Sequence, residues 1–129
     1  MWHQYRAGDE EGRRRILTAR GLDVSIPNVA RIYDFLLGGK DNYQADRDAA
    51  NTVLREIPHS ALACRQNRDF LARAVRVLAG AGIRQFLDIG SGLPTRSNVH
   101  EIAQAAAPGS RVVYVDYDHC KSGCAHDRG

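Results

Sequence analysis

The sequence lacks any long uninterrupted apolar run. Its apolar stretches fall short of the roughly 18 residues that a membrane-spanning helix needs. Charged residues occur throughout residues 1–20, so this segment has no apolar centre of the kind that a secretory signal requires. We therefore expect a protein of the cytoplasm that neither crosses a membrane nor is exported.

Cysteine is scarce, with three residues at positions 64, 120 and 124. Without an export signal, so few cysteines indicate reduced thiols rather than a disulfide framework. Cys120 and Cys124 stand near His119 and His126, but four ligands so close together match no standard zinc spacing. No metal site is predicted.

Lysine is nearly absent: Lys40 and Lys121 stand against sixteen arginines, and the formal net charge is only +3. The arginines are scattered among acidic residues, and 13–15 is their one tight cluster. We therefore expect an arginine-rich solvated surface, and no nucleic acid among the partners. A basic helical nucleic-acid-binding protein is the alternative.

The chain has 129 residues, of which 43% are apolar, enough for one core and too few for two. Hydrophobic periodicity predicts three helices over 29–37, 43–56 and 59–79, the first capped by Asn28. It then predicts a short buried strand over 83–89, a helix over 97–107 and a second strand over 111–116. The fold class is therefore α/β, a helical segment followed by one parallel crossover. Residues 1–24 are predicted to be a loose leader and 119–129 a divergent tail.

The informative stretch is the turn after the first predicted strand, which contains Asp88, Gly90 and Gly92. Glycines allow the main chain to turn sharply and to approach a ligand closely. Asp116 ends the next strand, where an acidic residue can accept hydrogen bonds from ribose hydroxyls. Together these residues predict a nucleoside-cofactor pocket at the carboxyl ends of the strands.

The type of cofactor follows from what surrounds the glycines. A dinucleotide fingerprint needs a third glycine where Thr95 stands. The carboxylate of Asp88 would repel a pyrophosphate, but it suits a cationic ligand. These residues favour S-adenosylmethionine over a dinucleotide, and a strand–turn–helix without a ligand remains the alternative. His100 is either structural or close to the pocket.

Segments along most of the chain resemble one known family. They are residues 88–95, 98–101 and 112–118, and upstream 27–43, 45–47 and 67–71. Over residues 22–118 the chain resembles an actinobacterial S-adenosylmethionine-dependent methyltransferase family, formerly a domain of unknown function. The resemblance implies a Rossmann-like class I methyltransferase fold, a seven-stranded sheet with helices on both faces. It also implies S-adenosylmethionine as cofactor and a methyl acceptor that the family leaves undefined.

The resemblance assigns residues to the cofactor site, whereas the catalytic residues stay unknown. Asp88, Gly90 and Gly92 match the glycine-loop motif, and Asp116 matches the ribose-binding acid. The polar residues around Gly38 and Gly39 match the amino-terminal signature: Arg31, Tyr33, Asp34, Lys40, Asp41, Asn42, Asp46 and Arg47. We hypothesise that this group, with Arg31 and Asp41 as cofactor-binding residues, forms a lid or wall over the cleft. The alternative is a self-contained, salt-bridged helix–loop–helix.

The resemblance ends at Asp118, eleven residues before the sequence does. The chain is therefore expected to be the amino-terminal part, residues 25–118, of a truncated domain, a weakly active or inactive methyltransferase fragment. An unpaired apolar strand edge would invite self-association. The alternative function is a non-catalytic module that binds an adenosine-containing ligand or a partner.

Overall fold

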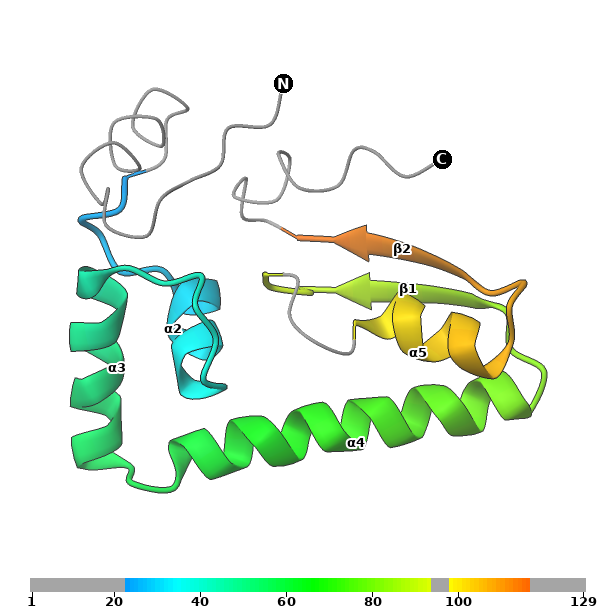
Figure 1. Ribbon diagram of the computed structural model, residues 1–129, viewed down its shortest axis with the longest axis horizontal. Coiled ribbons are helices and arrows are strands. Elements are labelled where there is room, and N and C mark those ends of the chain that lie inside the picture. The colour runs from blue at the N-terminus through cyan, green and yellow to red at the C-terminus, as the bar shows by residue number, and fades with distance from the viewer. Residues whose placement is uncertain (1–22, 94–97, 117–129) are drawn as a thin grey trace.

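The computed structural model describes residues 23–93 and 98–116. Its elements are α2 (Val29–Leu36), α3 (Gln44–Glu56), α4 (Ser60–Gly80), β1 (Gln85–Ile89), α5 (Val99–Ala106) and β2 (Arg111–Val115). Figure 1 shows two groups of elements along α4: α2 with α3 near its beginning, and the two strands with α5 near its end. The predicted order of helices followed by strand, helix and strand is confirmed. The predicted leader and tail lie almost wholly outside the described residues.

The two strands form a parallel pair, with Gln85 opposite Arg111 and Ile89 opposite Val115. Parallel neighbours need a long crossover connection, which here contains α5. The predicted start of the first strand at residue 83 is wrong by two residues. Ile83 instead donates its backbone N–H to the Leu78 carbonyl over 3.0 Å, as part of the turn that ends α4.

The core lies between one face of the sheet and the helices α4 and α5. Val75 of α4 and Ile102 of α5 are buried there, together with Val99 and Ala103. Phe86 and Val112, which face each other across the strands, pack against this cluster. Because side chains alternate along a strand, the next pair toward the carboxyl ends on this same face is Asp88 with Tyr114.

The opposite face of the sheet is uncovered by the described residues. Leu87 and Ile89 are 61% and 73% exposed, and Val113 and Val115 of β2 are exposed as well. The prediction of a buried strand is therefore wrong for this face, because no described helix packs against it. Phe70 of α4 is likewise 63% exposed, although the helical pattern groups it with buried Val75.

A buried carboxylate holds α2 and α3 together. Asn28 is the N-cap of α2, as predicted, and accepts from the backbone N–H groups of Ala30 and Arg31. Its own N–H donates to Asp46 Oδ1 over 2.8 Å, and Arg31 Nε donates to Asp46 Oδ2 over 2.8 Å. The backbone N–H of Tyr43, at the start of α3, donates to the same Oδ2. Asp46 therefore binds both helices at their amino-terminal ends.

A second carboxylate closes the loop between these helices. Asp34 Oδ2 accepts from the Asp41 backbone N–H over 2.8 Å and from Asn42 Nδ2 over 2.9 Å. A Cβ placed on Gly39 would fall onto the Asp34 carboxylate. Gly38 beside it has φ +79°, in the left-handed region that favours glycine. The Gly38-Gly39 pair thus ends α2, as predicted, and leaves room for the carboxylate.

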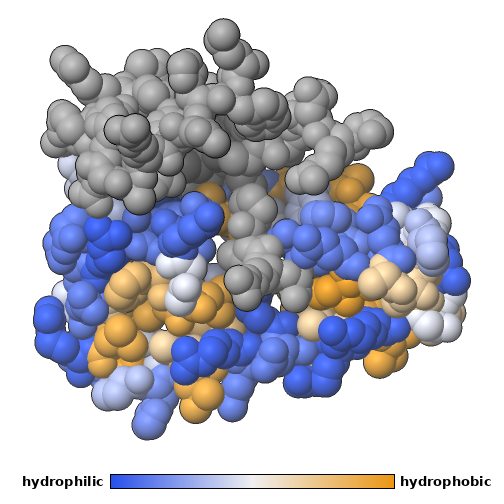
Figure 2. All heavy atoms as spheres, in the orientation of Figure 1, coloured by the Kyte–Doolittle hydropathy of each residue, from blue (hydrophilic) through white to orange (hydrophobic). Residues whose placement is uncertain are grey.

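The surface combines polar and apolar areas. Figure 2 shows apolar side chains gathered over the junction of α2, α3 and the beginning of α4, with hydrophilic side chains around them. Among the residues that the structure describes, no helix has the length and apolarity to span a bilayer.

We predict that Gly39→Ala destabilises the fold by about 1–3 kcal/mol, because the added methyl group must displace a hydrogen-bonded carboxylate. The matched control is Gly80→Ala at the end of α4, where an added Cβ meets nothing within 4 Å. This control should be neutral or slightly stabilising. Urea unfolding measures both, and equal effects would contradict the role given to Asp34.

We predict that Arg31→Met lowers the free energy of unfolding by about 3–5 kcal/mol. The substitution leaves the Asp46 carboxylate, which is 0% exposed, without its cation. The control is Arg55→Met, because Arg55 is exposed and, among the described residues, its guanidinium donates only to Thr52 Oγ1 at the surface. This control should change stability by no more than about 0.5 kcal/mol. A loss for Arg31→Met as small as that of the control would argue against the buried pair.

Candidate functional site

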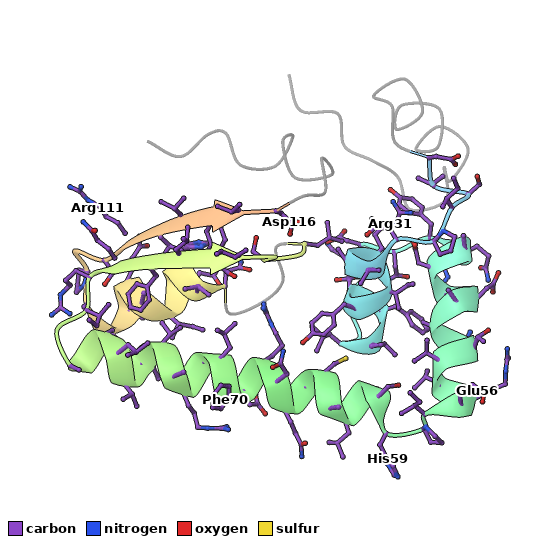
Figure 3. The ribbon with its side chains drawn as sticks, turned by 180° about the vertical axis from the view of Figure 1, so that it is seen from behind. Arg31, Glu56, His59, Phe70, Arg111 and Asp116 are labelled. Carbon is purple, nitrogen blue, oxygen red and sulfur yellow. The ribbon has the colours of Figure 1, made fainter. Side chains whose placement is uncertain are left out.

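The predicted glycines and the predicted acid meet where β1 and β2 end. Gly90 and Gly92 have φ +72° and +63°, both in the left-handed region. The N–H of Gly90 donates to the Val115 carbonyl over 2.7 Å, and the N–H of Gly92 donates to Asp116 Oδ2 over 2.7 Å. Figure 3 shows Asp116 at the end of β2 that lies toward α2, with Arg111 at the far end. The glycine turn is thus bonded to the carboxyl end of β2.

Asp88 stands at the same end of the sheet, one residue before the end of β1. It is half-buried and lies opposite Tyr114, on the face that α4 and α5 cover. Within residues 23–93 and 98–116, its carboxylate has no hydrogen-bond or ion-pair partner. A half-buried carboxylate beside a glycine turn is therefore available to a cationic ligand.

Tyr114 and His100 form a contact beside Asp88. The Tyr114 hydroxyl accepts from the His100 backbone N–H over 2.9 Å and lies 2.6 Å from His100 Nδ1. The two rings meet edge to face, with centroids 5.8 Å apart. Burial is the main cause that raises the pKa of Tyr114 above its ordinary value. The negative charges of Asp88 and Glu101 raise this pKa as well, whereas the hydrogen bond from the His100 N–H and the positive charge of Arg68 lower it.

The sequence alone leaves the role of His100 open and predicts no role for Tyr114. The position of Tyr114 along its strand could have predicted its place. Tyr114 and Asp88 each stand one residue before the end of a strand, so a parallel pairing places them opposite each other. No comparable signal in the sequence pairs Tyr114 with His100. That contact depends on where α5 begins relative to β2.

Arg31 and Asp41 belong to the α2–α3 unit. Arg31 is 3% exposed and donates to Asp46 and to the Ile26 carbonyl. Its guanidinium carbon lies over the Tyr43 ring, 5.4 Å from the ring centroid. Asp41 is exposed, and its backbone N–H donates to Asp34. These contacts fit the alternative of a self-contained helix–loop–helix. A direct role of either residue in cofactor binding stays a prediction.

The glycine turn also lies close to α2. A Cβ placed on Gly92 would be 4.0 Å from the Ala30 Cβ. Helix α2 therefore flanks the turn, and Figure 3 shows α2 on the side of the sheet where β2 ends at Asp116. The geometry is compatible with α2 as a wall of a cleft.

Other candidate chemistry is absent from the part of the chain that the structure covers. No group of three or more His, Cys, Asp or Glu residues is arranged to hold a metal ion there. The cysteines and histidines of the tail, 119–126, lie outside the described residues. Cys64 is half-buried, and burial raises the pKa of its thiol, which disfavours a nucleophilic thiolate.

Two solved structures are similar to this chain. A candidate methyltransferase from Thermobifida fusca YX is 56% identical, with a TM-score of 0.73 over 76% of this chain and 37% of its own. A DUF574 family protein from Streptomyces avermitilis MA-4680 is also 56% identical, with a TM-score of 0.69 over 71% of this chain and 36% of its own. The chain thus spans little more than a third of these proteins. A comparison with curated proteins found no match.

The identity of about one half over three quarters of this chain shows that the fold is the corresponding part of those structures. A family model described as S-adenosyl methyltransferase matches residues 16–125, a range that contains every helix and strand described above. The chain belongs to the S-adenosyl methyltransferase family.

Proposed function

We propose that this chain forms the cofactor-binding part of an S-adenosylmethionine-dependent methyltransferase. S-adenosylmethionine supplies an activated methyl group on a sulfonium, and the protein supplies binding and orientation. Asp88 holds the cationic methionine end of the cofactor, and Asp116 holds the ribose. Gly90 and Gly92 let the main chain come close to the cofactor between these two carboxylates.

The observation that carries the proposal is the carboxylate of Asp88 beside the glycine turn, which has no partner among the residues that the structure describes. Keeping a carboxylate partly out of water without a partner costs free energy, which a cationic ligand offsets. The α-amino group and the sulfonium of S-adenosylmethionine are both positive. A dinucleotide carries negative phosphates instead, so the same carboxylate disfavours it.

Asp116 supports the ribose end of the proposal. One of its oxygens accepts from Gly92 N–H, which fixes the carboxylate at the end of β2. A carboxylate has about four acceptor positions, so one such bond is compatible with accepting from a ribose hydroxyl. An acid at this position of a doubly wound fold commonly binds ribose hydroxyls.

Transfer of the methyl group needs an acceptor held in line with the sulfonium. The chain spans 37% and 36% of the two similar structures, so the acceptor and its binding residues stay outside this proposal. We propose that the described residues bind the cofactor, and that methyl transfer is the activity of the domain of which they are part. The sequence-based prediction of a truncated fragment remains untested.

Calorimetric titration with two ligands tests the assignment of the carboxylates. S-adenosylhomocysteine carries the amino-acid group, and 5′-methylthioadenosine lacks it. Asp88→Asn should weaken S-adenosylhomocysteine binding about tenfold or more and leave 5′-methylthioadenosine binding unchanged, because only the former has the cation. Asp116→Asn should weaken both ligands, because both have the ribose.

The matched control is Asp69→Asn, an exposed carboxylate on α4 that should leave both affinities unchanged. Asp41→Ala should weaken S-adenosylhomocysteine if the loop after α2 covers the cleft, and an unchanged affinity would favour the self-contained helix–loop–helix. A wild-type chain that takes up neither ligand would overturn the proposal. If it instead bound DNA or RNA with a strong salt dependence, the basic-protein alternative would gain support.

A second proposal concerns association between copies of the chain. Each described strand has one neighbour only, and the sheet face with Leu87, Ile89 and Val113 is exposed and apolar. Free strand edges and exposed apolar faces favour pairing with a further chain. We propose that the sheet is the surface through which copies of this chain associate.

Sedimentation over a range of protein concentrations tests this association. The mean mass of the wild-type chain should rise with concentration, and Val113→Lys should reduce the rise because it places a charge on the exposed sheet face. The control is Val77→Lys, at a position that is 70% exposed on α4. A wild-type mass that stays monomeric, or an equal effect of both substitutions, would refute the role of the sheet.

A further inference from the structure

Tyr114 and Val115 of β2, and Asp116 directly after it, form hydrogen bonds to the glycine turn and to the start of α5. Asp116 accepts from Gly92 N–H, and the Val115 carbonyl accepts from Gly90 N–H. The Tyr114 hydroxyl accepts from the N–H of His100, the second residue of α5. The glycine turn and the start of α5 are thus both bonded to the same short stretch, residues 114–116.

The Tyr114 hydroxyl makes two hydrogen bonds to His100, one to its backbone and one to its ring. A backbone N–H can only donate, so the hydroxyl oxygen accepts from His100 N over 2.9 Å. The hydroxyl also lies 2.6 Å from His100 Nδ1, and which of the two donates there depends on the ring tautomer. Tyr114 thus contacts both the main chain and the side chain of His100.

These bonds act on a part of α5 that needs a partner. The N–H groups in the first turn of a helix have no acceptor within the helix. Glu101 Oε2 accepts from Asn98 N–H over 2.8 Å, just before the helix begins. The Tyr114 hydroxyl accepts from the His100 N–H in the same turn. Strand β2 therefore fixes the position at which α5 starts.

Resting on the proposed function, we propose that Tyr114 is a positioning residue for the cofactor. Through its two hydrogen bonds to His100, it aligns the start of α5 with the glycine turn and with Asp88. Among the described residues, the charged groups that act on its hydroxyl come from three elements: Asp88 of β1, Glu101 of α5 and Arg68 of α4. The pKa of a tyrosine lies well above neutral pH and burial raises that of Tyr114 further, so its hydroxyl stays protonated there.

The first arm of the test uses cofactor affinity and a conservative rescue. Tyr114→Phe keeps the ring and removes both hydrogen bonds, so S-adenosylhomocysteine should bind about three- to tenfold more weakly. His100→Leu should weaken binding in the same direction. His100→Asn should stay within about twofold of wild type, because the asparagine amide can accept from or donate to the hydroxyl in place of Nδ1. If Asn and Leu at position 100 behaved alike, the specific hydrogen bond would be refuted.

The second arm measures hydrogen exchange of single amides by NMR and needs no ligand. In Tyr114→Phe the amides of His100 and Gly92 should both exchange faster relative to the amide of Phe86 in the core. A merely structural loss of stability would instead speed all three together. An unchanged Gly92 rate would overturn the proposal, because the contact at His100 would then not reach the glycine turn.

The two arms separate this proposal from the proposed function. If the wild-type chain bound no S-adenosylhomocysteine, the proposed function would fall, and the positioning of the cofactor by Tyr114 would fall with it. If the wild type and Tyr114→Phe bound it equally, the positioning role would be refuted and the cofactor site would stand.

Discussion

The bond between the Gly92 N–H and the Asp116 carboxylate joins the turn after one strand to the end of its neighbour. It requires a parallel pair, because only then do the carboxyl ends of β1 and β2 lie at the same edge. It also requires glycine at two positions, since Gly90 and Gly92 adopt positive φ. The position of the proposed cofactor site follows from these two conditions.

The α2–α3 unit borders the proposed site, because Ala30 of α2 lies beside Gly92. Its polar residues are largely occupied with one another: Asp46 binds both helix starts, and Asp34 closes the loop between them. These bonds hold α2 in a fixed conformation, with Ala30 beside Gly92. A dense polar motif can therefore matter to a ligand site without its side chains contacting the ligand, because the motif shapes the wall that borders the turn.

Much of this arrangement could be predicted from the sequence. The glycines, the acid after the second strand and the caps at Asn28 and Gly38 are local signals, and parallel strands bring the first two together. The partners of Arg31 could not be predicted, since the charges between residues 31 and 47 alternate and the pattern does not show which pair is buried. The exposed sheet face was also missed, because an apolar strand looks the same whether or not a second layer covers it.

Helix α4 carries both groups of elements, as Figure 1 shows. Near its beginning, the Tyr33 hydroxyl of α2 accepts from Asn67 Nδ2 and donates to the Cys64 carbonyl. Further along, Val75 enters the core beneath the sheet. Each residue of an α-helix adds a rotation of about 100°. One residue inserted between these two attachments would rotate the α2–α3 unit about the helix axis, away from the glycine turn. The number of residues from Asn67 to Val75 therefore sets the orientation of the two groups, and this stretch does not tolerate insertions or deletions.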